Sequence, residues 1–268
     1  KKYPKLIYAS ASGFGQTGPL KELPAYDMVV QGMGGLMSVT GHPNSEPTRV
    51  GTSIGDITAG LFTAIGINAA LYDRQKTGKG TFIDVSMLDC QIAILENAIA
   101  RYLSKNEIPE PMGSRHPSIA PFEAFKTKDN YIIIAAGNDK LFEKLCNVLN
   151  ITEIANDERF NTNSLRCENM NQLKKIFEKQ LKSKTTDEWI KEMELLKIPC
   201  GPILNIKQAV ENPQIKERNM IVKSYHKIIG EFKSAGNPIK MSTYKDTDTR
   251  GDIPDLNEHR EKIIKEFS

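Results

Sequence analysis

Apolar positions recur at helical spacing in the first 110 residues, between short apolar runs that are typical of strands. Residues 57–73 carry apolar side chains three or four positions apart, and Gly78 follows them as a natural stop. This pattern predicts a helix that begins at Ile57. Short runs at residues 6–10 and 81–85 predict strands on either side of it, and residues 87–103 predict a second long helix. The alternation of strand and helix indicates an α/β layer architecture.

Beyond the Pro109/Pro111 linker the pattern changes to a hairpin followed by helices. Residues 121–125 and 131–135 predict two short strands about a polar turn. Three helices are expected at residues 139–149, 171–181 and 186–195, the last capped by Thr185 or Thr186. These elements predict a second, smaller α+β domain over residues 112–200. By contrast, segment 28–39 is rich in glycine, and its pattern of apolar positions does not distinguish a helix from a strand.

The remaining chain, residues 201–268, is expected to return to the large domain formed by residues 1–111. It contains a predicted helix at residues 206–211, strand-like pieces near Ile221 and Ile239, and a charged helix at residues 257–267. Because the chain starts without Met and enters a strand within a few residues, we expect an N-terminal part to precede it.

The composition narrows the function classes. The 268 residues are 39% hydrophobic and 26% charged, as in a soluble globular protein. A net charge of +3, from 36 basic and 33 acidic side chains, is too small for binding nucleic acid by counterion release. No uninterrupted apolar run approaches the roughly 18 residues of a membrane span. The four cysteines are widely spaced, without the spacing of a metal site. We therefore expect a soluble intracellular protein with no metal, nucleic-acid or membrane partner.

The glycine run at residues 13–18 matches G-x-G-x-x-G, the turn that binds dinucleotides. That turn needs a long helix after it, whereas Pro19 and Pro24 allow at most one helical turn. A glycine-rich surface turn, or a turn that lines an active site, fits the sequence better.

Two residues stand out for their chemistry, each with a purely structural alternative. Asp56 precedes the predicted helix, where a carboxylate commonly serves as an N-cap; the same place would hold it ionised for reaction beside two glycines. His116 lies in a polar loop that opens the small domain and is either a solvated surface residue or part of a lid.

Several short runs in fixed order resemble the class III CoA-transferase family, the CaiB/BaiF type. The runs are IYAS (7–10), SGFGQTGP (12–19), PAYD (24–27), GLMSVTG (35–41), GD (55–56), TGKG (77–80), IDVSMLD (83–89), HP (116–117), FKTKD (125–129) and IPCGPI (198–203). The resemblance covers nearly the whole chain. Among family members it is strongest to the succinate–hydroxymethylglutarate type, especially through residues 113–138.

The resemblance implies a large Rossmann-like α/β domain, incomplete here at its N-terminus, a smaller α+β domain, and an interlocked homodimer. It implies that Asp56 is the residue that carries covalent intermediates. It also places the CoA thioester near the turn formed by Ser12, Gly13, Phe14 and Gly15, and a lid at Gly113, Ser114, Arg115 and His116. This lid departs from the family's glycine run, because it holds one glycine followed by Arg-His-Pro.

The implied activity is the transfer of CoA from an acyl-CoA to a carboxylic acid, with dicarboxylates suggested by the overall likeness. CoA would be a substrate, and no permanently bound cofactor is expected. Arg49 and Arg115 are candidates to pair with a distal carboxylate. The implied compartment is the mitochondrion in a eukaryote and the cytoplasm otherwise.

Two alternatives stay open from the sequence. The α-methylacyl-CoA racemases share this fold but carry a His where this chain has Tyr26, 30 residues before Asp56. A tyrosine is a poor replacement for that base, which favours the transferase. A catalytically silent piece that only dimerises or binds CoA is the second alternative.

Overall fold

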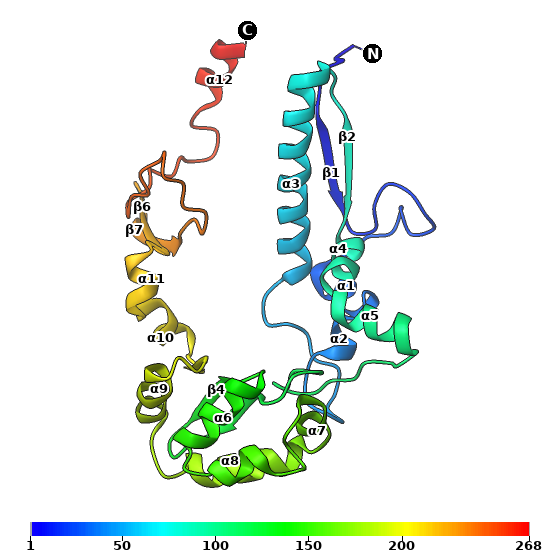
Figure 1. The fold of residues 1–268 in the computed structure, drawn as a ribbon. Coiled ribbons are helices and arrows are strands. Elements are labelled where there is room, and N and C mark those ends of the chain that lie inside the picture. Colours follow the sequence, from blue (N-terminus) through cyan, green and yellow to red (C-terminus); the bar gives the residue numbers. More distant parts are fainter. Residues whose placement is uncertain (1, 268) are drawn as a thin grey trace. The chain divides into compact units, whose positions relative to one another are not determined.

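The computed structural model describes residues 2–267, and the chain divides into two compact units, Lys1–Cys200 and Gly201–Ser268. The fold is α/β, as predicted. A further division of the first unit near residue 112 stays a prediction. The first half of that unit contains β1 (Tyr8–Ser12), α1 (Asp27–Met33), α2 (Leu36–Val39), α3 (Ile54–Thr77), β2 (Phe82–Ser86), α4 (Met87–Ile94) and α5 (Glu96–Lys105) (Figure 1).

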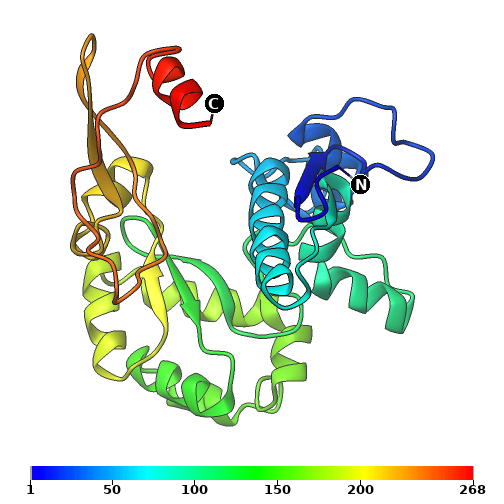
Figure 2. The same ribbon diagram turned by 90° about the horizontal axis from the view of Figure 1, so that it is seen from above.

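The strands β1 and β2 form a parallel pair in which Ser10 lies opposite Asp84. Parallel strands need a long crossover connection, and α3 provides it, lying beside both strands in two perpendicular views (Figure 2). Gly66 permits the close approach, because a Cβ there would lie 3.1 Å from Cγ2 of Ile83. The helix ends at Gly78, which adopts φ 69° and donates its N–H to the carbonyl of Arg74.

Two sequence predictions need correction in this half. The helix α3 begins at Ile54 rather than Ile57, so its N-cap is Ser53 and Asp56 lies inside the first turn. The predicted long helix over residues 87–103 is two helices. At Leu95 the backbone leaves helical geometry (ψ 28°), and its N–H bonds the carbonyl of Ile92, one residue short of an α-helical bond.

The ambiguous segment 28–39 folds as the two short helices α1 and α2, separated by Gly34 and Gly35. Gly35 has φ 85°, a conformation that glycine adopts without strain. Gly34 allows α1 to lie against α4, since a Cβ there would come within 2.5 Å of Cβ of Gln91. The glycines that obscured the sequence pattern are thus required by backbone conformation and by close packing.

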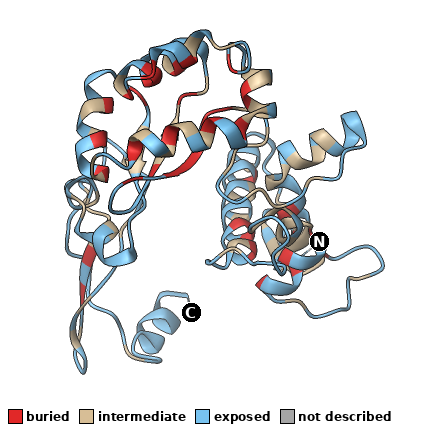
Figure 3. Cartoon of the chain, turned by 90° about the horizontal axis from the view of Figure 1, so that it is seen from below, coloured by how far each residue is buried: buried red, intermediate tan, exposed pale blue. Residues whose placement is uncertain are grey.

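The second half of the unit surrounds one hydrophobic core. Its elements are β3 (Phe122–Lys126), β4 (Tyr131–Ala135), α6 (Asp139–Val148), the 3₁₀ helix η1 (Thr152–Asn156), α7 (Asn163–Glu168), α8 (Met170–Leu181), α9 (Thr186–Leu195) and β5 (Cys200–Pro202). The predicted hairpin is confirmed, with Ala124 opposite Ile133. Phe125 and Ile132 of the hairpin and Phe177 of α8 are fully buried, and Figure 3 shows this concentration of buried residues.

The capping of α9 is also confirmed at Thr185. Its side chain accepts the N–H of Glu188, whose carboxylate in turn accepts the N–H of Thr185. The N–H of Thr185, followed by the Thr185 hydroxyl, lowers the pKa of the Glu188 carboxyl below its ordinary value.

The second unit is small and sparsely buried. It contains α10 (Ile206–Glu211), α11 (Pro213–Glu217), β6 (Ile221–His226), β7 (Gly230–Ala235) and α12 (Arg260–Phe267). The prediction of a strand near Ile221 is confirmed, whereas the one near Ile239 is wrong. The partner strand β7 ends at Ala235, which lies opposite Ile221 at the start of β6. A short turn closed by Gly230, at φ 75°, joins the two strands.

The helix α3 is long and apolar enough, by length and composition, to cross a bilayer, with a mean hydropathy of 1.4 over its most apolar window. No other helix among residues 2–267 passes this test. The sequence prediction missed it because polar residues interrupt every apolar run. Since α3 contacts α1, α4 and both strands, its contacts are those of a helix that covers a sheet. Leu61, Ile65 and Tyr72 nevertheless remain largely exposed.

Candidate functional site

Asp56 is an exposed carboxylate in the first turn of α3. The helix dipole favours negative charge at this end. Gly55, directly before it, is buried against α1, where a Cβ would lie 2.8 Å from Cγ2 of Val30 and 3.1 Å from Oδ1 of Asp27. The glycine therefore allows the first turn to lie close against α1 while the next side chain faces solvent. An exposed carboxylate on a fixed turn is suited to act as a nucleophile.

Two buried side chains of α1 hold the loop that leads into Asp56. Oδ1 of Asp27 accepts the N–H of Gly55 at 2.8 Å, and Oδ2 accepts Nε2 of Gln31 at 2.8 Å. The Gln31 side chain also accepts the N–H of Val50 through Oε1 at 2.9 Å and reaches the carbonyl of Thr52 at 3.5 Å. Asp27 is 9% exposed and Gln31 is fully buried.

The sequence analysis did not assign a role to Asp27 or Gln31. A signal was present, because the two polar residues stand four positions apart and so share one face of the helix. The segment's ambiguous pattern hid this spacing, since a strand would place the same residues differently.

A second buried amide, Gln91, packs against α3 from α4. Nε2 of Gln91, on α4, donates to Oγ1 of Thr58 at 3.3 Å. Thr58 itself donates to the carbonyl of Ile54 at 2.7 Å, an internal bond of the helix. Gln91 thus joins α4 to α3, and its side chain makes this hydrogen bond to Thr58 rather than one to the loop before Asp56.

The glycine turn after β1 is fixed by hydrogen bonds to the strand ends. Oγ of Ser12 accepts the N–H of Gly15 at 3.0 Å, and the Asp84 carboxylate accepts the N–H of Gln16 at 2.9 Å. Gly13 packs so tightly on Ala25 that a Cβ would lie 2.4 Å from the Ala25 Cβ. The proposed contacts of Ser12, Gly13, Phe14 and Gly15 with a CoA thioester stay predictions. Because the Gly15 N–H is bonded to Ser12, it is not free for a substrate in this arrangement.

Each of the four predicted lid residues makes a hydrogen bond. Gly113, at φ 68°, donates its N–H to the carbonyl of Gly41 at 2.8 Å. Oγ of Ser114 accepts the N–H of Ala124 at 3.0 Å, and Arg115 reaches the carbonyl of Cys167 at 3.4 Å. His116 donates its N–H to the carbonyl of Phe122 at 3.0 Å, and their rings stack at 5.2 Å.

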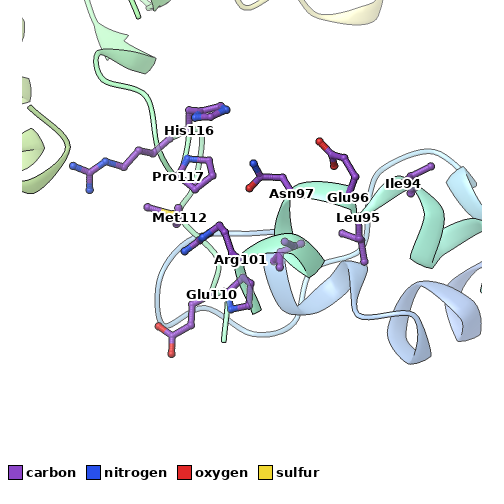
Figure 4. Close-up of a pocket in the computed structure, with 14 residues that line it drawn as sticks. Ile94, Leu95, Glu96, Asn97, Arg101, Glu110, Met112, His116 and Pro117 are labelled. Atoms are coloured by element: carbon purple, nitrogen blue, oxygen red, sulfur yellow. The ribbon is translucent and has the colours of Figure 1, made fainter. Parts of the chain in front are cut away.

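A cavity of about 270 Å³ lies between this segment and α5. Gly113, Arg115 and His116 line it together with Asn97 and other residues of α5 and the linker. Figure 4 shows Asn97 and Glu96 projecting from α5 on the side where His116 lies. Neither Asp56 nor the turn of residues 12–15 is among its lining residues. The structure thus brings most of the lid residues together, but it does not join them to Asp56 in one cavity.

The cysteines offer no activated thiol among residues 2–267. All four are free thiols, and burial raises the pKa of each, to about 12 for Cys146. A thiol with a raised pKa is a poor nucleophile near neutral pH. The same residues contain no group of three or more His, Cys, Asp or Glu side chains placed to bind a metal ion.

Comparisons with known proteins place these features in context. Residues 1–260 match the model of CoA-transferase family III. The chain is 44% identical over 99% of its length to the acetyl-CoA:oxalate CoA-transferase of Acetobacter aceti, and 36% identical over 98% to the human succinyl-CoA:glutarate CoA-transferase. It spans 67% and 60% of those two relatives. A crystal structure of a CaiB/BaiF family protein from Brucella suis, 39% identical, superposes with a TM-score of 0.81 over 99% of this chain and 68% of that one.

Proposed function

We propose a function from the family to which this chain belongs, CoA-transferase family III. The chain transfers CoA from an acyl-CoA to a dicarboxylic acid through intermediates on Asp56. The observation that carries this proposal is the exposed Asp56 carboxylate in a first helical turn that buried groups hold in place. The dicarboxylate class rests on the relatives named for oxalate and glutarate transfer.

The chemistry needs only the Asp56 carboxylate and the two substrates. The carboxylate attacks the thioester carbon of the acyl-CoA and expels CoA thiolate, which leaves a mixed anhydride on Asp56. The thiolate then attacks the aspartyl carbon, releasing the donor acid and forming an aspartyl-CoA thioester. The acceptor carboxylate attacks this thioester and expels the thiolate again. Attack of the thiolate on the acceptor's acyl carbon yields the new acyl-CoA and restores the Asp56 carboxylate.

These intermediates hydrolyse if water reaches them, so the site requires a cover. We assign this role to Gly113, Ser114, Arg115 and His116, and thioester binding to the turn formed by Ser12, Gly13, Phe14 and Gly15. The lid assignment is supported by the left-handed Gly113, a position where the backbone can turn sharply. For the distal carboxylate, both arginines stay candidates: Arg49 bonds the carbonyls of Val50 and Gly51 in the loop that leads to Asp56, and Arg115 lines the cavity and reaches the carbonyl of Cys167.

A homodimer is part of the proposal. Leu61, Ile65 and Tyr72 expose apolar surface along α3, and contiguous apolar surface of this kind marks an interaction site. A partner subunit that covers this face would remove it from water.

The racemase alternative is less well supported. A racemase needs a base on each face of the α-carbon, and Tyr26 stands where those enzymes carry a His. Tyr26 is therefore a weak candidate for that role.

The test uses the full-length protein, an acyl-CoA donor and isotopically labelled oxalate or glutarate, with formation of labelled acyl-CoA measured over time. Asp56→Ala and Asp56→Asn are expected to lose transfer by several orders of magnitude, because each removes the nucleophile. Asp73→Ala is the matched control, since it removes another exposed carboxylate from the same helix.

Transfer that survives in both Asp56 variants would overturn the proposal. Incorporation of solvent deuterium at the α-carbon without CoA transfer would favour the racemase. Neither reaction in the parent protein would leave a binding or dimerisation role.

A further inference from the structure

Gln31 is a fully buried polar side chain on α1 with contacts to three groups. Burial of an amide is unfavourable unless its hydrogen bonds are replaced. Here its Nε2 donates to Asp27 at 2.8 Å and lies 3.5 Å from the Thr52 carbonyl, while its Oε1 accepts the N–H of Val50 at 2.9 Å. Two of these three groups belong to the loop that enters α3.

The groups around Gln31 match an amide side chain better than a carboxylate or an apolar one. The Asp27 carboxylate and the Thr52 carbonyl accept hydrogen bonds, whereas the Val50 N–H donates one. The side chain between them must therefore present a donor at one end and an acceptor at the other. Glutamate, as a carboxylate, offers only acceptors, and methionine, similar in length, offers no strong donor or acceptor.

The amide and Asp27 together fix the backbone at three points within six residues. Gln31 holds Val50 and Thr52, and Asp27, itself bonded to Gln31, holds the N–H of Gly55. The residue after Gly55 is Asp56. The position of the Asp56 backbone thus depends on a buried pair that no substrate needs to touch.

We propose that Gln31 is a positioning residue, acting through Asp27 and the loop of residues 50–55 to hold Asp56 in place for attack on the thioester. This inference rests on the proposed function. Covalent transfer makes strict demands on position, because the same carboxylate must meet the donor acyl group, the CoA thiolate and the acceptor acid in turn. A shift of about 1 Å in a reacting group can cost a hundredfold in rate.

The experiment measures kcat, KM and thermal stability of the full-length protein carrying Gln31→Met or Gln31→Glu. We expect kcat for CoA transfer to fall roughly tenfold to a hundredfold, with KM for the acyl-CoA unchanged. The rate at which an acyl or CoA adduct appears on Asp56 in a quenched reaction should fall by the same factor.

Gln91→Met is the matched control. It removes an amide of the same size and burial that also packs against α3, but it leaves the hydrogen bonds of the 50–55 loop intact. It is expected to keep the parent kcat, whatever its effect on the melting temperature.

Parent kcat and adduct rate in both Gln31 variants, with only a lowered melting temperature, would overturn the positioning role. If Gln31→Met does not fold, Gln31→Glu decides the matter, because it keeps the size and the acceptor for Val50. A parent protein that neither transfers CoA nor forms an adduct would instead refute the proposed function, so the two failures are distinguishable.

Discussion

Two regions of the first unit are stabilised in different ways. Residues 120–198 pack around an apolar core in which Phe125, Phe177 and Trp189 are buried. Around Asp56, the backbone is held by hydrogen bonds from buried polar side chains, chiefly Asp27 and Gln31. An apolar core tolerates small shifts of its members, whereas hydrogen bonds fix particular atoms. If Asp56 is the nucleophile that we propose, it is better held by the second arrangement.

The largest expected effect on stability is in the apolar core. Phe177→Ala removes a fully buried ring that contacts Phe125 and Phe142 at centroid distances of 5.8 and 6.2 Å. We expect a loss of about 3–5 kcal/mol in the free energy of unfolding, measured by urea denaturation. Val30→Ala, at the fully buried apolar position of α1, should cost clearly less, since it removes two carbons. A loss of less than about 1 kcal/mol for Phe177→Ala would contradict its place in the core.

An intermediate effect is expected at Arg166, a fully buried cation in the otherwise apolar core. Its guanidinium donates to the carbonyls of Ala120 and Phe160 and to the Asp139 carboxylate, at 2.8, 3.0 and 2.7 Å. Arg166→Met should cost about 2–3 kcal/mol, because two buried carbonyls lose their donor. Asp139→Asn is the control and should cost about 1 kcal/mol or less, since that carboxylate is exposed. An unchanged free energy of unfolding in Arg166→Met would show that the core does not depend on these hydrogen bonds.

The smallest effect is expected at the surface of the same region. Thr185→Ala removes half of the capping box of α9 and should cost about 1 kcal/mol in urea denaturation at neutral pH. The other half involves Glu188, whose carboxyl pKa is lowered by the N–H of Thr185. Its contribution is therefore present above the ordinary pKa of a glutamate and lost as the pH falls through the lowered value. A Glu188→Gln variant that is as acid-sensitive as the parent would contradict this reading.

The sequence predicts the region of the apolar core, residues 120–198, better than the region around Asp56. The hairpin, the helix over residues 186–195 and its Thr185 cap are all confirmed, because each rests on local periodicity and capping chemistry. The helix over residues 87–103 fails at Leu95, where no proline or glycine marks the break. Such a break depends on tertiary packing that a single segment does not encode.

In the candidate site, too, one residue could be predicted from the sequence and another could not. Asp56 is found from its short Gly-Asp pair within a family pattern, although its place in the helix was misjudged by one turn. Gln31 is invisible to that approach, because its role depends on contacts with Val50 and Thr52, some twenty residues further along the chain. Contacts of this kind emerge only once the fold is known.

The central claim is that Asp56 carries the covalent intermediate. The most direct measurement incubates the full-length protein with succinyl-CoA, quenches the reaction, and maps any acyl or CoA adduct by peptide mass spectrometry. The account predicts an adduct on the peptide that contains Asp56, absent in Asp56→Ala. Turnover with an unmodified Asp56 peptide, or an adduct that persists in Asp56→Ala, would contradict it.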